Sequence, residues 1–519
     1  MKKNILLITV TLLVSLVACR KENTGSNDQS IDNNVLKEKI NPSPVPAGNP
    51  FTVSEIDKMI TGKMDSQIIF SWEEATLPYI WSATVNSDHT LAVGYRPLDE
   101  NDVDRIIHTI NLKEGKWKAV HDAIIKLVID LLNKNNPNPV SLNSILVEDD
   151  NTLPVLTFRL TDRNVITALY NLENTRYLEP LGYYPADSRY QYRTQSSSGC
   201  GGSTESLNAS DWTTILPNCR LPWNYNSVNI PAAWDISQGE GIKIGIIDAG
   251  ISSSQALLNS EFNNGLSAGT RTITTDYTYG SSAFTSCAHG TSMSGLAAGP
   301  RNDQDAVTGV AYKASLHFIH ACADVVLDES AEKTGVKNAL VKMGNITDLK
   351  VVSMSVGYPF SSSVLKDGCT YAYNKGKMLM AAAGTSFSWT SWWGVIYPAA
   401  YSTCYAITGV KENGNTCSVC HDGSQVKFTI PMERSANANR NSLSLPLSGT
   451  IPTYIGGSSC ATATSAGIAA LVWGVKPSLT RDQVFTILKT TAQYYPTPNS
   501  SHGYGNLNAG AAVTLAQTY

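Results

Sequence analysis

Four short apolar segments in the second half of the chain constrain its fold more than any other feature. Each has the length of a buried strand, and they are IKIGIID (242–248), LHFIHA (316–321), LKVVSMS (349–355) and MLMAAAG (378–384). Between them, AEKTGVKNALVKMG (331–344) and VLKDGCTYAYNKG (364–376) are typical of helices. The alternation predicts an α/β fold with a doubly wound, mostly parallel sheet that is covered on both faces.

An earlier region, residues 51–185, has a different order of elements. LAVGYRPL, NSILVED, LPVLTFRL and TRYLEPLGY are strand candidates, and helix candidates cover 115–132 and 162–172, the second capped by Asp162. The order β-α-β-β-α-β predicts a small α+β, ferredoxin-like domain. The region from Phe51 to about Thr90 exceeds that unit, and we expect an added hairpin there.

Two polar segments divide the chain of 519 residues, which is long enough for two folded units. Residues 19–50 are rich in Asn, Ser and Pro, which favours a flexible tether without a fold. The Gly/Ser-rich stretch YRTQSSSGCGGSTES predicts an exposed linker with a processing site, assigned to residues 186–205. Folded domains are therefore expected at 51–185 and 206–519.

Residues 1–18 have the pattern of a targeting segment. Lys2 and Lys3 precede an apolar run from Ile5 to Ala18, which is too short for a stable membrane helix. Its end, LVAC, resembles a bacterial lipoprotein signal, in which Cys19 becomes the lipidated N-terminus, and an ordinary secretory signal is the alternative. We expect a protein of the bacterial cell envelope, anchored through this lipid alone on the periplasmic face or the cell surface.

The ten cysteines leave an odd number if Cys19 is lipidated, so at least one thiol stays free. Export permits disulfides, and Cys200 with Cys219 and Cys369 with Cys404 are candidate pairs. CSVCH (417–421) fits the attachment signal of a c-type haem, although we expect a loop disulfide there. Cys287 and Cys460 are expected to be small buried residues.

Three small-residue motifs carry candidate catalytic side chains. Asp248 ends an apolar strand, whereas His289 in SCAHGTSMSGLAAG and Ser459 in GGSSCATATSAG stand where helices are expected to begin. The unpaired N–H groups of a helix N-terminus favour negative charge that develops beside it. The chain order Asp, His, Ser is that of subtilisin-type triads, and no G-x-S-x-G elbow is evident. Taken singly, each residue could have a structural role.

The region 206–519 resembles a subtilase, a serine peptidase of family S8. Besides the three motifs, the resemblance rests on LPWNYNSVNIPAAWDISQGEGIKIGIIDAGI, VTGVAYKASL, VVSMSVG, MLMAAAG and YPAAY, in the family's order. The family's G-T-S-x-A falls on Gly457–Ala461, which makes Ser459 the candidate nucleophile. The resemblance implies a serine endopeptidase in which Asp248 orients His289, and His289 is the general base for Ser459.

The resemblance also implies how a peptide would bind. The strand residues for an extended peptide are Ser355, Val356 and Gly357, and the opposite wall consists of Ala382, Ala383 and Gly384. Thr385 stands where the family normally has asparagine, so the oxyanion hole would use the Ser459 N–H and the Thr385 hydroxyl. Loss of one such donor can cost about 2.7–4 kcal/mol. A catalytically impaired peptide-binding relative is therefore the alternative.

The domain at 51–185 ends with TFRLTDRNVITALYNLENTRYLEPLGY, which resembles the end of a subtilase propeptide. This implies a proenzyme that is inhibited by its own propeptide until the linker is cut, with a permanent accessory domain as the alternative. The expected partners are this propeptide and a protein or peptide substrate. A net charge of −4 argues against nucleic acid. No cofactor is certain, and calcium is possible through the resemblance, without assigned ligands.

Overall fold

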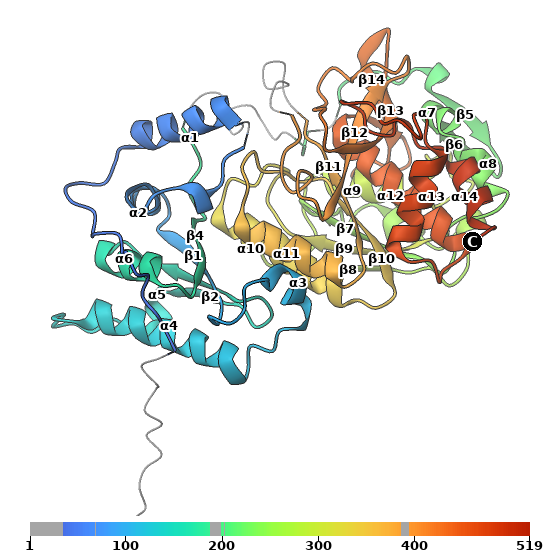
Figure 1. Ribbon diagram of the computed structural model, residues 1–519. Coiled ribbons are helices and arrows are strands. Elements are labelled where there is room, and N and C mark those ends of the chain that lie inside the picture. Colours follow the sequence, from blue (N-terminus) through green and yellow to red (C-terminus); the bar gives the residue numbers. More distant parts are fainter. Residues whose placement is uncertain (1–34, 68, 187–198, 202, 386–393) are drawn as a thin grey trace, which may run out of the picture.

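The computed structural model of the protein describes residues 35–67, 69–186, 199–201, 203–385 and 394–519. Residues 35–186 form an N-terminal unit, and residues 203–519 form a C-terminal unit beside it (Figure 1). Each unit has its own β-sheet. The expected signal segment and Cys19 lie outside the described residues.

The N-terminal unit is a four-stranded antiparallel sheet with helices, and its sheet order is β2-β3-β1-β4. The strands are β1 (Thr90–Tyr95), β2 (Leu146–Asp149), β3 (Val155–Arg159) and β4 (Thr175–Pro180). The helices are α1 (Val53–Gln67), α2 (Leu77–Val85), α3 (Val103–Ile106), α4 (Gly115–Asn133), α5 (Leu142–Ile145) and α6 (Arg163–Asn171), with the 3₁₀ turns η1 (Trp72–Glu74) and η2 (Ile107–Thr109). The Asp162 carboxylate caps α6, as the sequence predicts.

The hairpin expected between residues 51 and 90 is wrong, because this region is helical. Thr52 and Glu55 hydrogen-bond reciprocally, as in a capping box, and so start α1. Ile56, Ile60 and Met64 then follow at intervals of four, which places one face of α1 in the core. The sequence therefore contained a helix signal that the hairpin interpretation overlooked.

The end of the expected tether is docked on the N-terminal unit. The Lys37 N–H donates to Asn174 Oδ1, and the Ser43 N–H donates to Asn171 Oδ1. Residues 35–50 contain no helix and only the single bridge Glu38–Leu172. Their order comes from buried asparagine side chains of the unit, which a polar composition does not indicate.

The C-terminal unit contains the predicted mostly parallel sheet, in the order β15-β14-β13-β12-β11-β10-β7-β9-β8. Its strands are β7 (Lys243–Asp248), β8 (Ile273–Tyr277), β9 (Ser315–His320), β10 (Leu349–Met354), β11 (Met378–Ala382), β12 (Cys404–Lys411), β13 (Val426–Arg434), β14 (Asn437–Ser444) and β15 (Thr453–Ile455). The pairs β13–β14 and β14–β15 are antiparallel, and the remaining neighbours are parallel. β5 (Trp212–Ile215) and β6 (Cys219–Pro222) form a separate hairpin.

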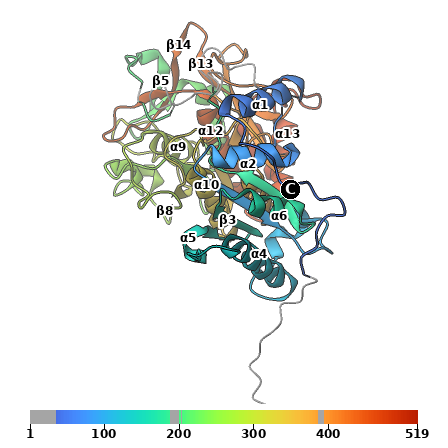
Figure 2. The same cartoon turned by 90° about the vertical axis from the view of Figure 1, so that its left-hand side faces the viewer.

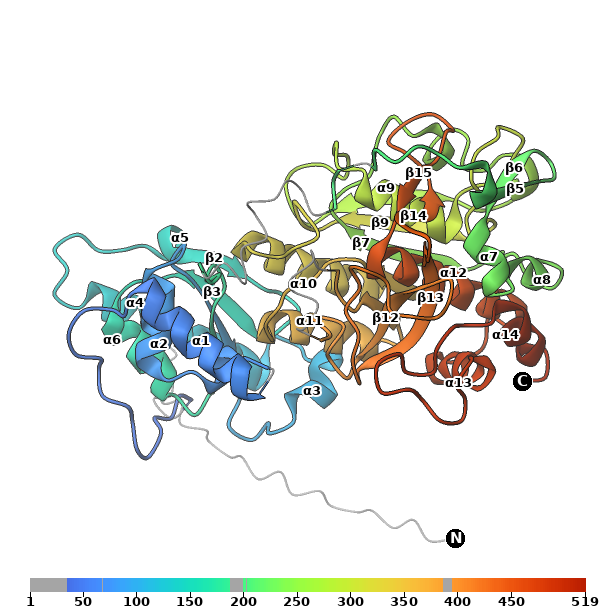
Figure 3. The ribbon, with the colours of Figure 1, turned by 90° about the horizontal axis from the view of Figure 1, so that it is seen from above.

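Helices cover both faces of this sheet, which confirms the doubly wound prediction (Figure 3). They are α7 (Trp223–Ser227), α8 (Ile230–Trp234), α9 (His289–Ala298), α10 (Ser330–Asn345), α11 (Ser363–Asn374), α12 (Gly457–Val475), α13 (Arg481–Thr491) and α14 (Ala509–Ala516), with the turns η3 (Ala209–Asp211), η4 (Ala256–Leu258) and η5 (Gly265–Ser267). Alternate strand residues supply the two cores. Met378 and Met380 of β11 pack with α9 and α12, whereas Leu379 and Ala381 pack with α10 and α11.

The N-terminal unit packs against α10 and α11, which separate its sheet from the larger one (Figure 3). In Figure 2, α1, α2 and α6 of this unit lie in front of the C-terminal unit. Buried charges mark this contact. Arg176 makes two hydrogen bonds of 2.8 Å to the Asp367 carboxylate, and Lys337 pairs with Glu148 and Asp150. Because a buried ion is costly without its partner, these pairs make the fit between the two units specific.

The cysteines pair differently from the expectation. Cys200 is bonded to Cys287, whereas Cys219, Cys369 and Cys404 are free and buried. Cys369 and Cys404 lie next to each other, as the prediction required, but as thiols. Cys287 is buried, as the sequence suggested, but it is also disulfide-bonded to a partner 87 positions away that only the fold brings to it.

Among the described residues, only α12 is long and apolar enough to span a membrane by length and composition. It is the central helix of the C-terminal unit, and nearly all of its residues are buried against the sheet and other helices. Its hydrophobicity is thus accounted for by the core.

Candidate active site

Asp248 and His289 are brought together at the carboxyl end of β7, where the sequence predicted a site. Asp248 is the last residue of β7, and His289 is the first residue of α9. His289 Nδ1 donates to Asp248 Oδ1 over 2.7 Å, and the same oxygen accepts the Ala249 N–H over 2.7 Å. The carboxylate is fully buried, so the pair is shielded from water.

The charge of the carboxylate governs the protonation of His289. Burial by itself favours the neutral imidazole, but the nearby Asp248 carboxylate outweighs it, with a smaller effect from Asp324. The pKa of His289 is therefore raised above its ordinary value. Such a histidine can accept a proton readily and hold it as an imidazolium.

Ser459 lies in the first turn of α12, as the small-residue motif predicts. Gly456 precedes the helix, and Gly457 has φ +77°, a conformation in which a side chain would be strained and would meet Thr385 at 2.6 Å. The N–H of Ser459 has no partner within the helix, because the first four N–H groups of a helix never do. Cys460 beside it is fully buried, which raises the pKa of its thiol well above the ordinary value and disfavours a thiolate.

His289 and Ser459 line one cleft of about 290 Å³. The predicted substrate residues that also line it are Ser355, Val356, Gly357, Ala382 and Gly384. Ala383 instead packs in the core, since neighbouring residues of an extended chain point to opposite sides. Ala383 therefore does not form part of the pocket wall, contrary to the prediction.

Thr385 lines the same cleft, and its hydroxyl is bonded to Ser458 rather than to Ser459. Thr385 Oγ1 accepts the Ser458 N–H over 3.1 Å and lies 3.0 Å from Ser458 Oγ. The Gly384 N–H in turn donates to Ser458 Oγ over 3.1 Å. The start of α12 is thereby joined to the chain that follows β11.

Part of the expected linker lies in the cleft. Gly199, Gly201 and Ser203 line it together with His289. A Cβ on Gly199 would be 3.0 Å from His289 Cδ2 and 2.7 Å from Val325, so only glycine fits between them. Cys200 ties this segment to Cys287, two residues before His289. The segment is thus not simply exposed, as its Gly/Ser composition suggested, and residues 187–198 lie outside the described residues.

Sequence reasoning missed several lining residues. They are Val325, Val326, Ile396, Asn439, Asn441 and Tyr454. Tyr454 could have been suspected, because it lies just before the GGSSCATATSAG motif, but the asparagines come from β14, which folds over the site. Among the described residues, no group of three or more His, Cys, Asp or Glu side chains is placed to hold a metal ion.

Sequence comparisons with known proteins indicate one family. Residues 239–506 match the sequence model of the Subtilase family. Thermitase of Thermoactinomyces vulgaris is 29% identical over 288 residues, which is 55% of this chain and 93% of thermitase. Subtilisin E of Bacillus subtilis is 31% identical over 296 residues, which is 56% of this chain and 71% of subtilisin E. A solved protease structure from Pseudoalteromonas arctica is 23% identical, with a TM-score of 0.47, and the match covers 57% of this chain and 96% of that one.

Proposed function

This chain belongs to the subtilase family and is a serine-type endopeptidase, and we propose that its catalytic triad is Asp248, His289 and Ser459. The observation that carries the proposal is the buried 2.7 Å hydrogen bond between His289 and Asp248, in a cleft that Ser459 also lines. The substrate is a peptide bond of a protein or peptide. The triad residues come from β7, α9 and α12, three separate parts of the chain.

Each triad residue has a distinct role in this mechanism. Since Nδ1 of His289 donates to Asp248, Nε2 accepts the proton of Ser459 as the hydroxyl oxygen attacks the carbonyl carbon. The imidazolium that results is stabilised by Asp248. It then gives the proton to the leaving amine, which leaves an acyl-enzyme on Ser459, and water releases the acyl group by the same steps in reverse.

The oxyanion that forms in these steps requires donors that point into the cleft. The Ser459 N–H is one, since the first turn of α12 leaves it unpaired. The Thr385 hydroxyl is the second in our proposal. Its oxygen already accepts the Ser458 N–H, and if Ser458 donates its hydroxyl proton to Thr385, the Thr385 proton is available to the substrate oxygen. Such donors are worth about 2.7–4 kcal/mol each.

We further propose that the substrate lies extended along Ser355–Gly357. Gly357 itself is already paired with the segment before α10, because its N–H donates to Val325 O over 2.7 Å and its C=O accepts the Leu327 N–H over 2.9 Å. An extended peptide would add to these strand-like segments through its backbone, and Ala382 and Gly384 would bound the first side-chain pocket. Their small size suits a large side chain at that position.

The N-terminal unit is proposed to be a propeptide. Its contact with α10 and α11 combines buried ion pairs with apolar and aromatic side chains of both units, such as Phe70 against Phe360, so the unit covers this face closely until the linker is cut. The linker residues in the cleft agree with inhibition before cleavage. We expect the cut within residues 186–205.

The experiment compares residues 20–519 as wild type and as Ser459→Ala, by intact mass and by reaction with a fluorophosphonate. We expect only the wild type to divide into two fragments and only Ser459 to carry the label. If both proteins stay whole but the wild type is labelled, the triad stands and self-processing is excluded. If Ser459 is not labelled either, the proposed catalytic role is wrong, and a peptide-binding role takes its place.

We propose export and lipid anchoring at Cys19 from the N-terminal sequence alone. Metabolic labelling with an alkyne fatty acid tests this in bacterial cells that make the full chain. The label should appear on the wild type in the membrane fraction and disappear from Cys19→Ala. A labelled Cys19→Ala, or an unlabelled wild type, contradicts the proposal.

A further inference from the structure

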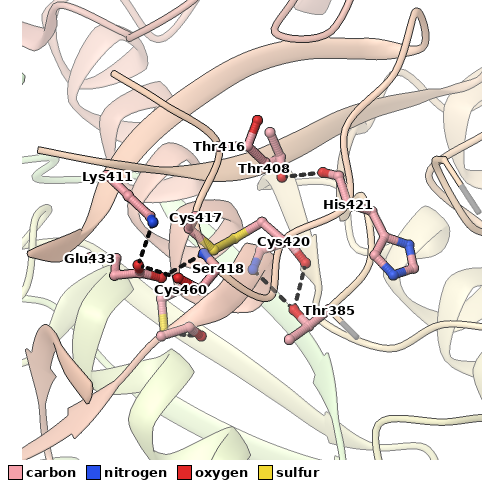
Figure 4. The surroundings of a disulfide bond; sticks show 12 residues. Thr385, Thr408, Lys411, Thr416, Cys417, Ser418, Cys420, His421, Glu433 and Cys460 are labelled. Carbon is pink, nitrogen blue, oxygen red and sulfur yellow. Dashed lines mark hydrogen bonds and ion pairs between the residues drawn. A yellow bond between two sulfur atoms is a disulfide. The ribbon is translucent and has the colours of Figure 1, made fainter. Parts of the chain in front are cut away.

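The CSVCH motif, which the catalytic proposal does not use, forms a buried loop behind the active site. It follows β12, and a disulfide joins Cys417 to Cys420, the alternative that the sequence favoured over haem (Figure 4). With the two sulfurs bonded to each other, neither is available for attachment of a haem. Both cysteines are almost fully buried, so the loop belongs to the interior.

One end of the loop contacts the wall of the cleft. Cys420 forms an isolated antiparallel bridge with Thr385, and the His421 N–H donates to Gly384 O over 2.9 Å. Thr385 and Gly384 both bond to Ser458, the neighbour of Ser459. A continuous path of contacts therefore connects the disulfide with the start of α12.

The His421 ring occupies the space behind Gly384. A Cβ on Gly384, whose φ is +126°, would be 2.4 Å from His421 Nδ1. Nδ1 is 2.8 Å from Gly394 O and donates to it, so the ring has a defined orientation. Burial lowers the pKa of His421 to about 4, which makes the ring neutral at physiological pH. Nε2 has no partner among the described residues, so the ring acts here by shape and by its single donor.

The loop is also attached to the strands β12 and β13 of the sheet (Figure 4). The Ser418 N–H and hydroxyl each donate to the Glu433 carboxylate of β13 over 2.7 Å, and the Thr408 hydroxyl of β12 donates to His421 O. The loop thus connects two strands of the sheet with Gly384 and Thr385. A disulfide that closes so short a segment restrains the unfolded chain little compared with one that closes a long loop, so its main effect is on local geometry.

We propose that the Cys417–His421 loop is a positioning element for the Gly384–Thr385 wall of the active site. The disulfide keeps Cys420 paired with Thr385, and His421 supports Gly384 from behind. The inference rests on the proposed role of Thr385 at the oxyanion. A shift of the wall by about 1 Å can cost about 100-fold in rate, because donors act only in the correct geometry.

The test replaces the disulfide in the full chain with Cys417→Ser/Cys420→Ser. Its matched control is Cys369→Ser/Cys404→Ser, which also alters two neighbouring buried sulfurs but lines no part of the cleft. On a quenched-fluorescent peptide library, we expect kcat of the test variant to fall between about 10-fold and 100-fold, with KM nearly unchanged. The control should keep the wild-type kcat.

Hydrogen exchange provides a readout that does not need activity and also applies if the variant is destabilised. Backbone amides of residues 378–385 should exchange faster in the test variant, whereas those of β7 should not change. A global loss of structure would accelerate both, and folded Cys200→Ser treated with a dithiol then replaces the variant, because a dithiol would also reduce Cys200–Cys287 in the wild type. Equal exchange at 378–385 in oxidised and reduced protein overturns the inference.

Two substitutions of His421 distinguish the effect of the ring's shape from the effect of its hydrogen bond to Gly394 O. His421→Ala should lower kcat, and His421→Asn, whose amide can still donate to Gly394 O, should recover part of it. If the wild type cleaves peptides and every loop variant has the control's kcat, the inference is wrong and the proposed function stands. If the wild type neither cleaves nor reacts with a fluorophosphonate, the proposed function fails, and exchange alone decides whether the loop holds the wall.

Discussion

The two sides of the cleft are held by different kinds of link. On the β7–α9 side, Asp248 and His289 bond directly, and the nearby disulfide from Cys287 reaches a segment 87 positions earlier in the chain. On the β11–α12 side, Thr385 reaches Ser458 through its hydroxyl, and the nearby disulfide spans only three positions. The Cys200–Cys287 disulfide connects the site to a distant segment of the chain, whereas the Cys417–Cys420 disulfide cross-links a short local turn.

This difference indicates what each disulfide can control. Breaking Cys200–Cys287 would free Gly199, which lies against His289, and Gly201, which lines the cleft, and both belong to the expected linker. Breaking Cys417–Cys420 would loosen a wall that the chemistry uses. Opposite effects on reactivity are therefore expected from two chemically identical bonds.

The largest effect should come from the β7–α9 side. Asp248→Asn leaves the shape of the side chain but removes its charge, so His289 loses the partner that orients and stabilises its imidazolium. We expect kcat to fall about 10⁴-fold. Peptide turnover measures this, with Asp305→Asn, an exposed partner of Arg220, as a control that keeps its activity. A fall of less than tenfold in Asp248→Asn would contradict the triad.

A smaller effect is expected on the opposite side of the cleft. Thr385→Val removes the hydroxyl at nearly constant volume, and kcat should fall about 100-fold or more while KM changes little. Thr385→Asn supplies an amide donor at the same position and should retain more activity than valine. Equal kcat for the valine variant and wild type would show that the Ser459 N–H suffices as the donor.

The long-range disulfide should have a moderate effect of the opposite sign. In Cys200→Ser the segment beside His289 is no longer tied to Cys287, so access to Ser459 should increase. We expect fluorophosphonate labelling of Ser459 to become several-fold faster than in the wild type. A dithiol should accelerate labelling of the wild type at least initially and leave Cys200→Ser without such a gain. Slower labelling of Cys200→Ser would mean that the segment supports the site rather than obstructing it.

The smallest expected effect is a displacement of the pH profile. The general base must be neutral, and the pKa of His289 is raised above its ordinary value of 6.5. Activity should therefore fall as the pH drops through a value above 6.5. In Asp248→Asn the raising influence is lost while burial remains, so the acidic limb of the residual kcat/KM should move to lower pH. If the acidic limb of the variant's pH profile moved to higher pH instead, that limb would report the titration of a group other than His289.

Much of the fold and several site residues could be predicted because they depend on local pattern. Asp248 ends an apolar strand, and the small-residue run around Ser459 stands at the start of a helix, so both elements could be placed from local pattern, whereas the choice of Ser459 over Ser458 came from the family resemblance. The helical region at 53–85 was mispredicted although Thr52 and Glu55 form a recognisable cap. That error arose from neglecting a local signal and not from its absence.

Residues that reach the cleft from afar could not be predicted in the same way. Asn439 and Asn441 lie on an antiparallel strand added to a parallel sheet, and Gly199 comes from a Gly/Ser-rich stretch that has no periodicity. The pairing of Cys200 with Cys287 was likewise beyond the pattern, because cysteine spacing does not say which distant thiols meet, whereas the loop disulfide Cys417–Cys420 was expected. Ala383 was wrongly expected in the pocket wall because pattern alone did not show that its side chain points into the core.

Short-range periodicity and small-residue motifs were thus sufficient for the α/β class and the order of the strands along the chain, and they gave the candidate triad only together with the family resemblance. They act over one strand or one helical turn, where backbone geometry alone decides which side chains share a face. The contacts of Cys200 with Cys287, of Cys420 with Thr385 and of Arg176 with Asp367 became visible only in the folded protein. Such contacts join segments that are distant in the chain, and their partners are selected by the packing of whole layers and units.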